Sequence, residues 1–224
     1  MPFFYWQAEP MGRRALPKID PSVDLSQHLL TVDDLQQPFD PQQLFDKRQP
    51  LELEVGSGKG HFVLQQSQQN PNRNYLGNEI AFKYARFGAY RLAKNGRSNA
   101  RMIAGDGLKL FRELLPSHCA EDVHVYFPDP WWKERHRRRR VMQPGFVADI
   151  ERVLIPGGRF HFWTDVEEYF EETKSLLSDI SKMEGPMEVP LRAPEHDMDY
   201  QTHFERRMRL NGHDVFRSMY QMPC

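Results

Sequence analysis

Alternating apolar and polar positions predict strands followed by helices from residue 50 onward. Leu51, Leu53 and Val55 alternate with polar residues, as in a strand, and a glycine-rich segment and an amphipathic stretch follow them. The same order recurs along the chain. We predict further strands at 75–80, 101–104, 123–127 and 160–163, and helices at 81–94, 107–115, 144–154 and 166–182. Strands that alternate with helices are typical of an α/β fold with a mostly parallel sheet.

The two ends of the chain differ from this pattern. Residues 1–49 are rich in Pro, Gln and Asp, which predicts a poorly structured N-terminal arm ahead of one domain over residues 50–224. Near the other end, two stretches at 204–210 and 215–220 flank Asn211-Gly212. Because Asn-Gly suits the positive φ angles of a tight turn, we predict an antiparallel β-hairpin there.

Composition excludes several classes of protein. Hydrophobic residues make up 39% of the chain, and no apolar run approaches the roughly 18 residues that span a bilayer. The apolar run at residues 3–6 is too short for a signal peptide, so we expect a cytoplasmic protein without membrane contact. Cys119 and Cys224 offer neither a disulfide framework nor zinc-ligand spacing, and the histidines are scattered, so we expect no metal.

Charge is segregated along the chain even though the formal net charge is only −1. Residues 133–140 contain six cations and one acid, whereas acids gather at 33–34, 167–168 and 171–172. A basic segment of this density is suited to phosphate contacts, so it indicates a nucleic-acid partner.

Acidic residues follow successive predicted strands. Glu54, Glu79, Asp106 and Asp129 each lie at or near the carboxyl end of one strand. Because ligands of such sheets bind beyond these ends, we expect the four carboxylates to line one crevice. They would repel a pyrophosphate and attract a sulfonium, which favours S-adenosylmethionine over a dinucleotide.

A glycine turn follows the first of these strands. Gly56 and Gly58 would let the backbone approach a ligand closely, although a plain tight turn has the same composition. A dinucleotide-binding fingerprint would need its third glycine where His61 stands, and the spacing of a P-loop is absent. Both of these nucleotide-binding interpretations of the turn are therefore weakened.

The segment 127–140, Phe-Pro-Asp-Pro-Trp-Trp-Lys-Glu-Arg-His-Arg-Arg-Arg-Arg, is the most specific signal in the chain. Pro128 and Pro130 restrict the backbone on both sides of Asp129, so its carboxylate is held stiffly where the strand ends. Trp131 and Trp132 offer flat surfaces for stacking on a base, and the arginines offer phosphate contacts.

This segment, preceded by Leu-Glu-Val-Gly-Ser-Gly-Lys-Gly and followed by Thr164-Asp165, resembles the bacterial tRNA (guanine-N7)-methyltransferase family, also called the TrmB family. The resemblance covers about residues 50–220. It implies a class I S-adenosylmethionine-dependent fold with a mostly parallel seven-stranded sheet and a C-terminal antiparallel hairpin. It also implies methylation of a guanine in the tRNA variable loop, by a monomer or homodimer.

The resemblance assigns roles to individual residues. Cofactor contacts are implied for Glu54, Glu79 and Asp106, together with the glycine turn at Gly56 and Gly58, and Asp129 takes the catalytic position beside the cofactor. The substrate-binding set is Lys133, Asp165, Thr202, His203, Phe204 and Glu205. The RNA-contacting set is Arg135, His136, Arg137, Arg138, Arg139 and Arg140. The chain departs from the family at Asn78, usually apolar, at Glu134 and at residues 199–201.

Guanine N7 carries a lone pair and no proton, so its methylation needs no general base and depends on positioning. We expect Asp129, with Asp165 or Glu205, to accept hydrogen bonds from the guanine edge, while Trp131 stacks on or walls the base. Two alternatives remain open. An amino-methyltransferase acting on a nucleic-acid base has a similar loop, although the order Pro-Asp-Pro-Trp disfavours it; a non-catalytic RNA-binding protein would use residues 131–140 alone.

Overall fold

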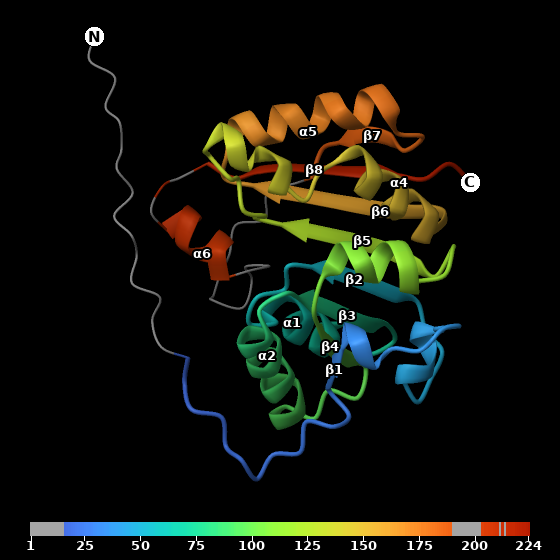
Figure 1. Ribbon diagram of the computed structural model, residues 1–224, viewed down its shortest axis with the longest axis vertical. Coiled ribbons are helices and arrows are strands. Elements are labelled where there is room, and N and C mark those ends of the chain that lie inside the picture. The colour runs from blue at the N-terminus through green and yellow to red at the C-terminus, as the bar shows by residue number, and fades with distance from the viewer. Residues whose placement is uncertain (1–15, 190–202, 211, 213) are drawn as a thin grey trace.

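The computed structural model describes residues 16–189, 203–210, 212 and 214–224. These residues form an eight-stranded sheet in the order β1-β4-β3-β2-β5-β6-β8-β7, with helices on both faces (Figure 1). The strands are β1 (Leu29–Thr31), β2 (Leu51–Val55), β3 (Asn74–Glu79), β4 (Ala100–Ala104), β5 (Ala120–Tyr126), β6 (Leu154–Thr164), β7 (Glu184–Met187) and β8 (Phe216–Gln221). All neighbouring pairs are parallel except those made by β8, which runs antiparallel to both β6 and β7.

The helices alternate with the strands as the sequence predicts. They are α1 (His61–Gln69), α2 (Phe82–Lys94), α3 (Gly107–Lys109), α4 (Pro144–Val153), α5 (Glu167–Ile180) and α6 (His203–Leu210). A π-helical turn, Leu110–Leu114, continues α3, and 3-10 turns occupy Val32–Asp34, Pro41–Leu44 and Glu134–Arg139. The α/β fold with a mostly parallel sheet is confirmed, with β1 as an additional edge strand.

Two apolar clusters fix the sheet between its helical layers. Phe146 and Ile150 of α4 and Tyr169 of α5 pack on the face that carries Phe160 and Phe162 of β6. On the other face, α1 and α2 cover Tyr75 and Met102 together with Tyr126 and Trp163, through Phe62, Val63, Ala89 and Leu92. Because both faces are covered, the edge formed by the carboxyl ends of the strands is where side chains converge on open space.

Part of the predicted N-terminal arm belongs to this sheet. Leu29–Thr31 pair with β4, and Val32 and Phe45 are buried in the cluster under α4. The domain boundary at residue 50 stays a prediction, and residues 1–15 lie outside the described part of the chain.

The predicted C-terminal antiparallel hairpin is confirmed, but β7 and β8 form it, so the predicted pairing of 204–210 with 215–220 is wrong. The first segment is helix α6, and β8 pairs with β6 and β7 instead. Glu205 and Arg209 lie one helical turn apart and form an ion pair at 3.1 Å, and Gly212, with φ of 71°, donates its N–H to the carbonyl of Arg209. A glycine that tolerates positive φ suits the end of a helix as well as a hairpin turn, so the Asn-Gly signal did not distinguish the two.

A polar network lies on the α1 face of the sheet. Asp122 accepts hydrogen bonds from Arg159 at 2.8 and 2.9 Å and pairs with His161 at 2.9 Å, and the rings of His161 and His124 stack. His124 in turn contacts Glu52 at 3.0 Å and the hydroxyl of Tyr126 at 2.8 Å. Burial alone would raise the pKa of Asp122, but hydrogen bonds from His161 and Arg159 hold it well below its ordinary value. Asp122, His124 and His161 have atoms of metal-ligand type within 4.8 Å of one another, and these contacts give each of them a protein partner.

Gly77 of β3 leaves the space that the turn after β2 requires. A Cβ at this position would lie 2.5 Å from Ser57 Oγ, 2.8 Å from Val63 Cγ2 and 2.9 Å from Met102 Sδ. We therefore expect Gly77→Ala to lower the free energy of unfolding by about 1–3 kcal/mol, as overpacking does elsewhere, measured by urea denaturation. Gly145→Ala is the control, because its Cβ would meet only the flexible end of Arg112; equal stability of the Gly77 variant and the wild type would contradict this packing.

Candidate active site

The glycine turn after β2 is bound to the end of β3. Gly56 and Gly58 adopt left-handed backbone angles, with φ of 78° and 53°, which side-chain-bearing residues rarely adopt. The N–H groups of Gly56 and Ser57 donate to the carbonyl of Asn78 at 2.9 and 2.8 Å. The turn therefore brings backbone, without side chains at 56 and 58, to the carboxyl edge of the sheet.

Glu79, the last residue of β3, connects this turn to α2. Its carboxylate accepts a hydrogen bond from Gly58 N at 2.9 Å through Oε2 and one from Ala81 N at 2.8 Å through Oε1. Each carboxylate oxygen can accept a further hydrogen bond. The carboxylate is thus held in one orientation and can still receive hydroxyl donors from a ligand.

Glu54 is the most strongly perturbed acid at this edge. Its side chain is buried, and Oε2 has no hydrogen-bond partner among the described residues. Burial, with a smaller contribution from the nearby carboxylate of Glu79, raises the pKa of Glu54 to about 7, while Ser57 and His124 oppose the shift. A buried carboxyl oxygen without a partner is uncommon, so it marks a place where a cationic or hydrogen-donating ligand would be stabilised.

Asp106 follows β4 and is exposed. Its carboxylate caps α3 by accepting hydrogen bonds through Oδ1 from Leu108 N at 2.8 Å and from Lys109 N at 3.4 Å. Glu54, Glu79 and Asp106 therefore stand at the carboxyl ends of three adjacent parallel strands, as the sequence predicts.

Two exposed apolar residues at this edge escaped the sequence analysis. Ile80 is 74% exposed and directly follows Glu79, and Leu108 is 37% exposed and follows Asp106 by two positions. The exposure of large apolar side chains beside these acids suggests surfaces for a flat apolar ligand group. The signal in the sequence was an apolar residue one position after Glu79 and two positions after Asp106.

Asp129 lies in a strained turn beyond β5. Phe127 and Trp131 flank it with φ of 49° and 47°, the left-handed region that costs non-glycine residues on the order of 1 kcal/mol or more each. The turn is fixed at both ends, because Phe127 N donates to the carbonyl of Trp163 at 2.8 Å and Arg140 Nε donates to the carbonyl of Pro130 at 2.7 Å. The carboxylate of Asp129 is exposed on this rigid support.

The two tryptophans of this segment have different environments. The guanidinium of Arg139 lies over the ring of Trp131 at 5.1 Å, and the ring of His136 meets it edge-on at 5.9 Å. Trp132 is 65% exposed. The face that is open for stacking on a base therefore belongs to Trp132 more than to Trp131.

The arginines of residues 135–140 divide into two groups. Arg137 pairs with Glu168 at 2.5 Å and with Glu172 at 2.9 Å, and buried Arg140 pairs with Glu172 and lies over the ring of Tyr169 at 4.7 Å. Both side chains fasten the turn to α5. Lys133, Arg135, Arg138 and Arg139 are exposed instead, and the half-buried His136 packs on Trp131.

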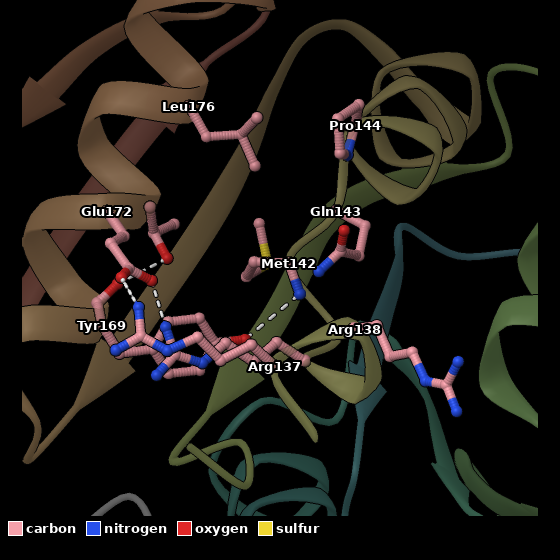
Figure 2. A pocket seen from close by; sticks show the side chains of 10 residues that line it. Arg137, Arg138, Met142, Gln143, Pro144, Tyr169, Glu172 and Leu176 are labelled. Atoms are coloured by element: carbon pink, nitrogen blue, oxygen red, sulfur yellow. Dashed lines mark hydrogen bonds and ion pairs between the residues drawn. The ribbon is translucent and has the colours of Figure 1, made fainter. Parts of the chain in front are cut away.

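A pocket of about 340 Å³ lies between this segment and α5. Figure 2 shows Arg137 turned toward Glu172 at one side of the pocket, the hydroxyl of Tyr169 joined to the backbone of Met142, and Arg138 pointing away. From the sequence, all the cations of residues 135–140 are predicted to contact RNA. The acidic partners of Arg137 and Arg140 could not be recognised there, because they are about 30 residues further along the chain.

The remaining predicted site residues come from β6 and α6. Asp165 follows β6 and is half-buried, so it stands at the same edge of the sheet. Glu205 is buried on α6, paired with Arg209 and 3.9 Å from Arg217, whose guanidinium lies over the ring of Trp163 at 4.9 Å. Figure 1 places α6 on the side to which the arrowheads of β5 and β6 point. Thr202 and the side chains of His203 and Phe204 lie outside the described residues.

Comparison with known proteins identifies relatives of this chain. Residues 48–218 match the model of a family described as "Putative methyltransferase". A tRNA (guanine-N(7)-)-methyltransferase of Rhodopirellula baltica is 48% identical over 94% of this chain and 80% of its own length. One from Pasteurella multocida is 33% identical over 82% of this chain and 72% of its own length.

Solved structures resemble the fold. The 16S rRNA methyltransferase KamB superposes with a TM-score of 0.59 at 17% identity, covering 82% of this chain and 92% of its own. The aminoglycoside resistance methyltransferase NpmB1 gives a TM-score of 0.54 at 17% identity, over 79% and 89%. In the described part of the chain, no helix has the length and apolar character to cross a bilayer.

The raised pKa of Glu54 predicts how the free energy of unfolding changes with pH. The folded state keeps a proton on Glu54 up to about pH 7, whereas the unfolded chain loses it near its ordinary pKa of 4.5, so the free energy of unfolding falls as pH rises between these values. Glu54→Gln removes this loss. We would measure the free energy of unfolding of both proteins by urea denaturation at pH 5 and at pH 8. The difference between variant and wild type should shift in favour of the variant by about 2 kcal/mol from pH 5 to pH 8. The same difference at both pH values would show that Glu54 ionises normally.

Proposed function

The chain belongs to the tRNA (guanine-N7)-methyltransferase family, and from this premise we propose that it transfers a methyl group from S-adenosylmethionine to N7 of a guanine in the variable loop of tRNA. The observation that carries the proposal is the set of carboxylates at one edge of the parallel sheet, with a strained, exposed Asp129 beside a basic surface. A cytoplasmic location and a monomeric or homodimeric state stay predictions.

The residues at this edge fit the cofactor. S-adenosylmethionine supplies a methyl group on a sulfonium, and it carries ribose hydroxyls and an ammonium group as hydrogen-bond donors. Glu54 has a buried acceptor oxygen without a partner, Glu79 has fixed acceptors, and Gly56 and Gly58 leave the backbone accessible. Asp106 contributes a third carboxylate, and Ile80 and Leu108 offer apolar surface for the adenine ring. This negative edge would repel the pyrophosphate of a dinucleotide.

We assign the recognition of guanine to Asp129. Its carboxylate accepts hydrogen bonds from N1–H and the exocyclic amino group, and it stabilises the positive charge that develops on the purine as N7 is methylated. The left-handed residues on both sides and the bond from Arg140 to Pro130 keep the carboxylate in place. Asp165 and Glu205, near the same edge, are second candidates for this contact.

The exposed cations form the surface for tRNA. Lys133, Arg135, Arg138 and Arg139 are exposed and follow the turn that carries Asp129, so phosphate contacts there would bring the variable loop to the cofactor edge. The exposed ring of Trp132 is positioned to stack on a neighbouring base. Arg137 and Arg140 hold the turn itself.

Two alternatives make different predictions. An amino-methyltransferase would place the methyl group on the exocyclic nitrogen of adenine or cytosine, which mapping of the product distinguishes. A non-catalytic RNA-binding protein would bind RNA in a salt-dependent manner without binding the cofactor. The strained support of Asp129 and the unpartnered oxygen of Glu54 are costs that such a protein would have no reason to retain.

Asp129→Asn tests the proposed catalytic role. The amide keeps the shape of the side chain but loses the negative charge, so turnover should fall by roughly 10²–10³-fold, the effect of removing one charge-stabilising contact. The Kd for S-adenosylmethionine should change by less than threefold, because Glu54 and Glu79 remain. We would measure turnover with saturating tRNA and cofactor binding by calorimetry. Equal losses in turnover and cofactor affinity would refute this assignment.

The division of the arginines predicts two different phenotypes. Arg138→Ala should weaken tRNA binding and lower the slope of log K against log salt by roughly 0.7–0.9, the loss of one phosphate contact. Arg140→Ala should mainly reduce stability, because it removes one of the two cations that pair with Glu172 and leaves the carbonyl of Pro130 without its donor. Filter binding from 50 to 300 mM salt and thermal unfolding would separate the two. A reduced salt slope with unchanged stability in the Arg140 variant would contradict the division.

A further inference from the structure

Asn78 lies at the meeting point of three loops of the cofactor edge. It is buried near the end of β3, and its backbone carbonyl receives the N–H groups of Gly56 and Ser57 from the turn after β2. Any residue could supply that carbonyl. The side chain is what distinguishes Asn78, since an apolar residue at this position could donate no hydrogen bond.

The amide of Asn78 is directed at the end of β4. Its Nδ2 donates to the carbonyl of Ile103 at 3.2 Å and to that of Gly105 at 3.1 Å. Gly105 has a φ of 135°, a backbone angle that needs to be held, and its N–H donates to the carbonyl of Glu79 at 3.0 Å. The chain leaving β4 is therefore attached to β3 through the carbonyl of Ile103 and through both the N–H and the carbonyl of Gly105.

The amide oxygen of Asn78 restricts where the backbone of the same loop can lie. A Cβ at Gly107 would lie 2.4 Å from Asn78 Oδ1, so the backbone at 107 runs directly against the asparagine side chain. Asp106 stands between these two contacts, and its carboxylate is fixed further by the hydrogen bond from Leu108 N. The position of Asp106 thus depends on a side chain of the neighbouring strand.

We propose that Asn78 is a positioning residue for the cofactor site, which ties the loop carrying Asp106 to the glycine turn and to Glu79. The inference rests on the proposed function, because it assumes that these loops hold S-adenosylmethionine. Asn78 itself is buried and acts through its neighbours. Its loss should weaken cofactor binding and leave tRNA binding and the chemical step nearly unchanged.

Asn78→Asp is the sharpest test. The carboxylate has the same size, but it loses both N–H donors and faces the carbonyl oxygens of Ile103 and Gly105. We expect the Kd for S-adenosylmethionine to rise about tenfold, on the order of one lost buried hydrogen bond. The Kd for tRNA should stay within twofold, and kcat at saturating cofactor within threefold. Asn78→Ile, which also lacks the donors, should give the same result without a buried charge.

Asn99→Asp is the matched control. Asn99 also donates through Nδ2 to backbone carbonyls, those of Ser67 at 3.1 Å and Arg73 at 2.8 Å, but it precedes β4 at the opposite edge of the sheet. Its variant should lower the melting temperature and leave the Kd for the cofactor within twofold. A comparable rise in Kd for the Asn99 variant would show a general loss of stability and overturn the proposal.

Hydrogen–deuterium exchange without cofactor separates this inference from the proposed function. In both Asn78 variants, the amides of residues 105–109 should exchange at least tenfold faster than in the wild type, while those of α5 stay protected. Unchanged exchange and unchanged cofactor affinity in the Asn78 variants would overturn the positioning role. A wild type that binds no S-adenosylmethionine would instead refute the proposed function, and the exchange data would still decide whether Asn78 holds the loop.

Discussion

The cofactor edge depends on the two backbone amides, those of Gly58 and Ala81, that hold the carboxylate of Glu79. These bonds join the turn after β2 to the start of α2, and they require the left-handed angle at Gly58 and the open space at Gly77. Burial of Glu54, together with the smaller effect of the negative charge on the fixed Glu79, raises the pKa of Glu54 to about 7. The site therefore maintains unfavourable electrostatics that a cationic ligand would relieve.

The protein balances its charges locally as well as overall. Acids of α5 neutralise Arg137 and Arg140, which fastens the Pro-Asp-Pro turn to the body of the domain. The cations left over, among them Arg138 and Arg139, face outward from that fastened turn. A net charge of −1 thus coexists with a basic surface and with a separate row of strand-end carboxylates, which suits a polyanionic substrate and a cationic cofactor.

Much of this arrangement could be predicted from the chain alone, because short periodic signals report on local structure. The strand at 51–55, the glycine turn and the strand-end acids follow from alternation and from the residues beside it. The partners of Arg137 could not be predicted, since pairing with Glu168 and Glu172 depends on how α5 packs. The hairpin turn predicted at Asn211-Gly212 was wrong, because residues with positive φ occur at the ends of helices as well as in hairpin turns. The role proposed for Asn78 could not be predicted either, because its hydrogen-bond partners follow from the pairing of β3 with β4.

The most direct test of the account is to incubate the purified protein with labelled S-adenosylmethionine and unmodified tRNA and to locate 7-methylguanine by chemical cleavage of the product. The account predicts one labelled guanine in the variable loop, with no label on exocyclic amino groups. Label on an adenine or cytosine amino group, or cofactor binding without any transfer to tRNA, would contradict it.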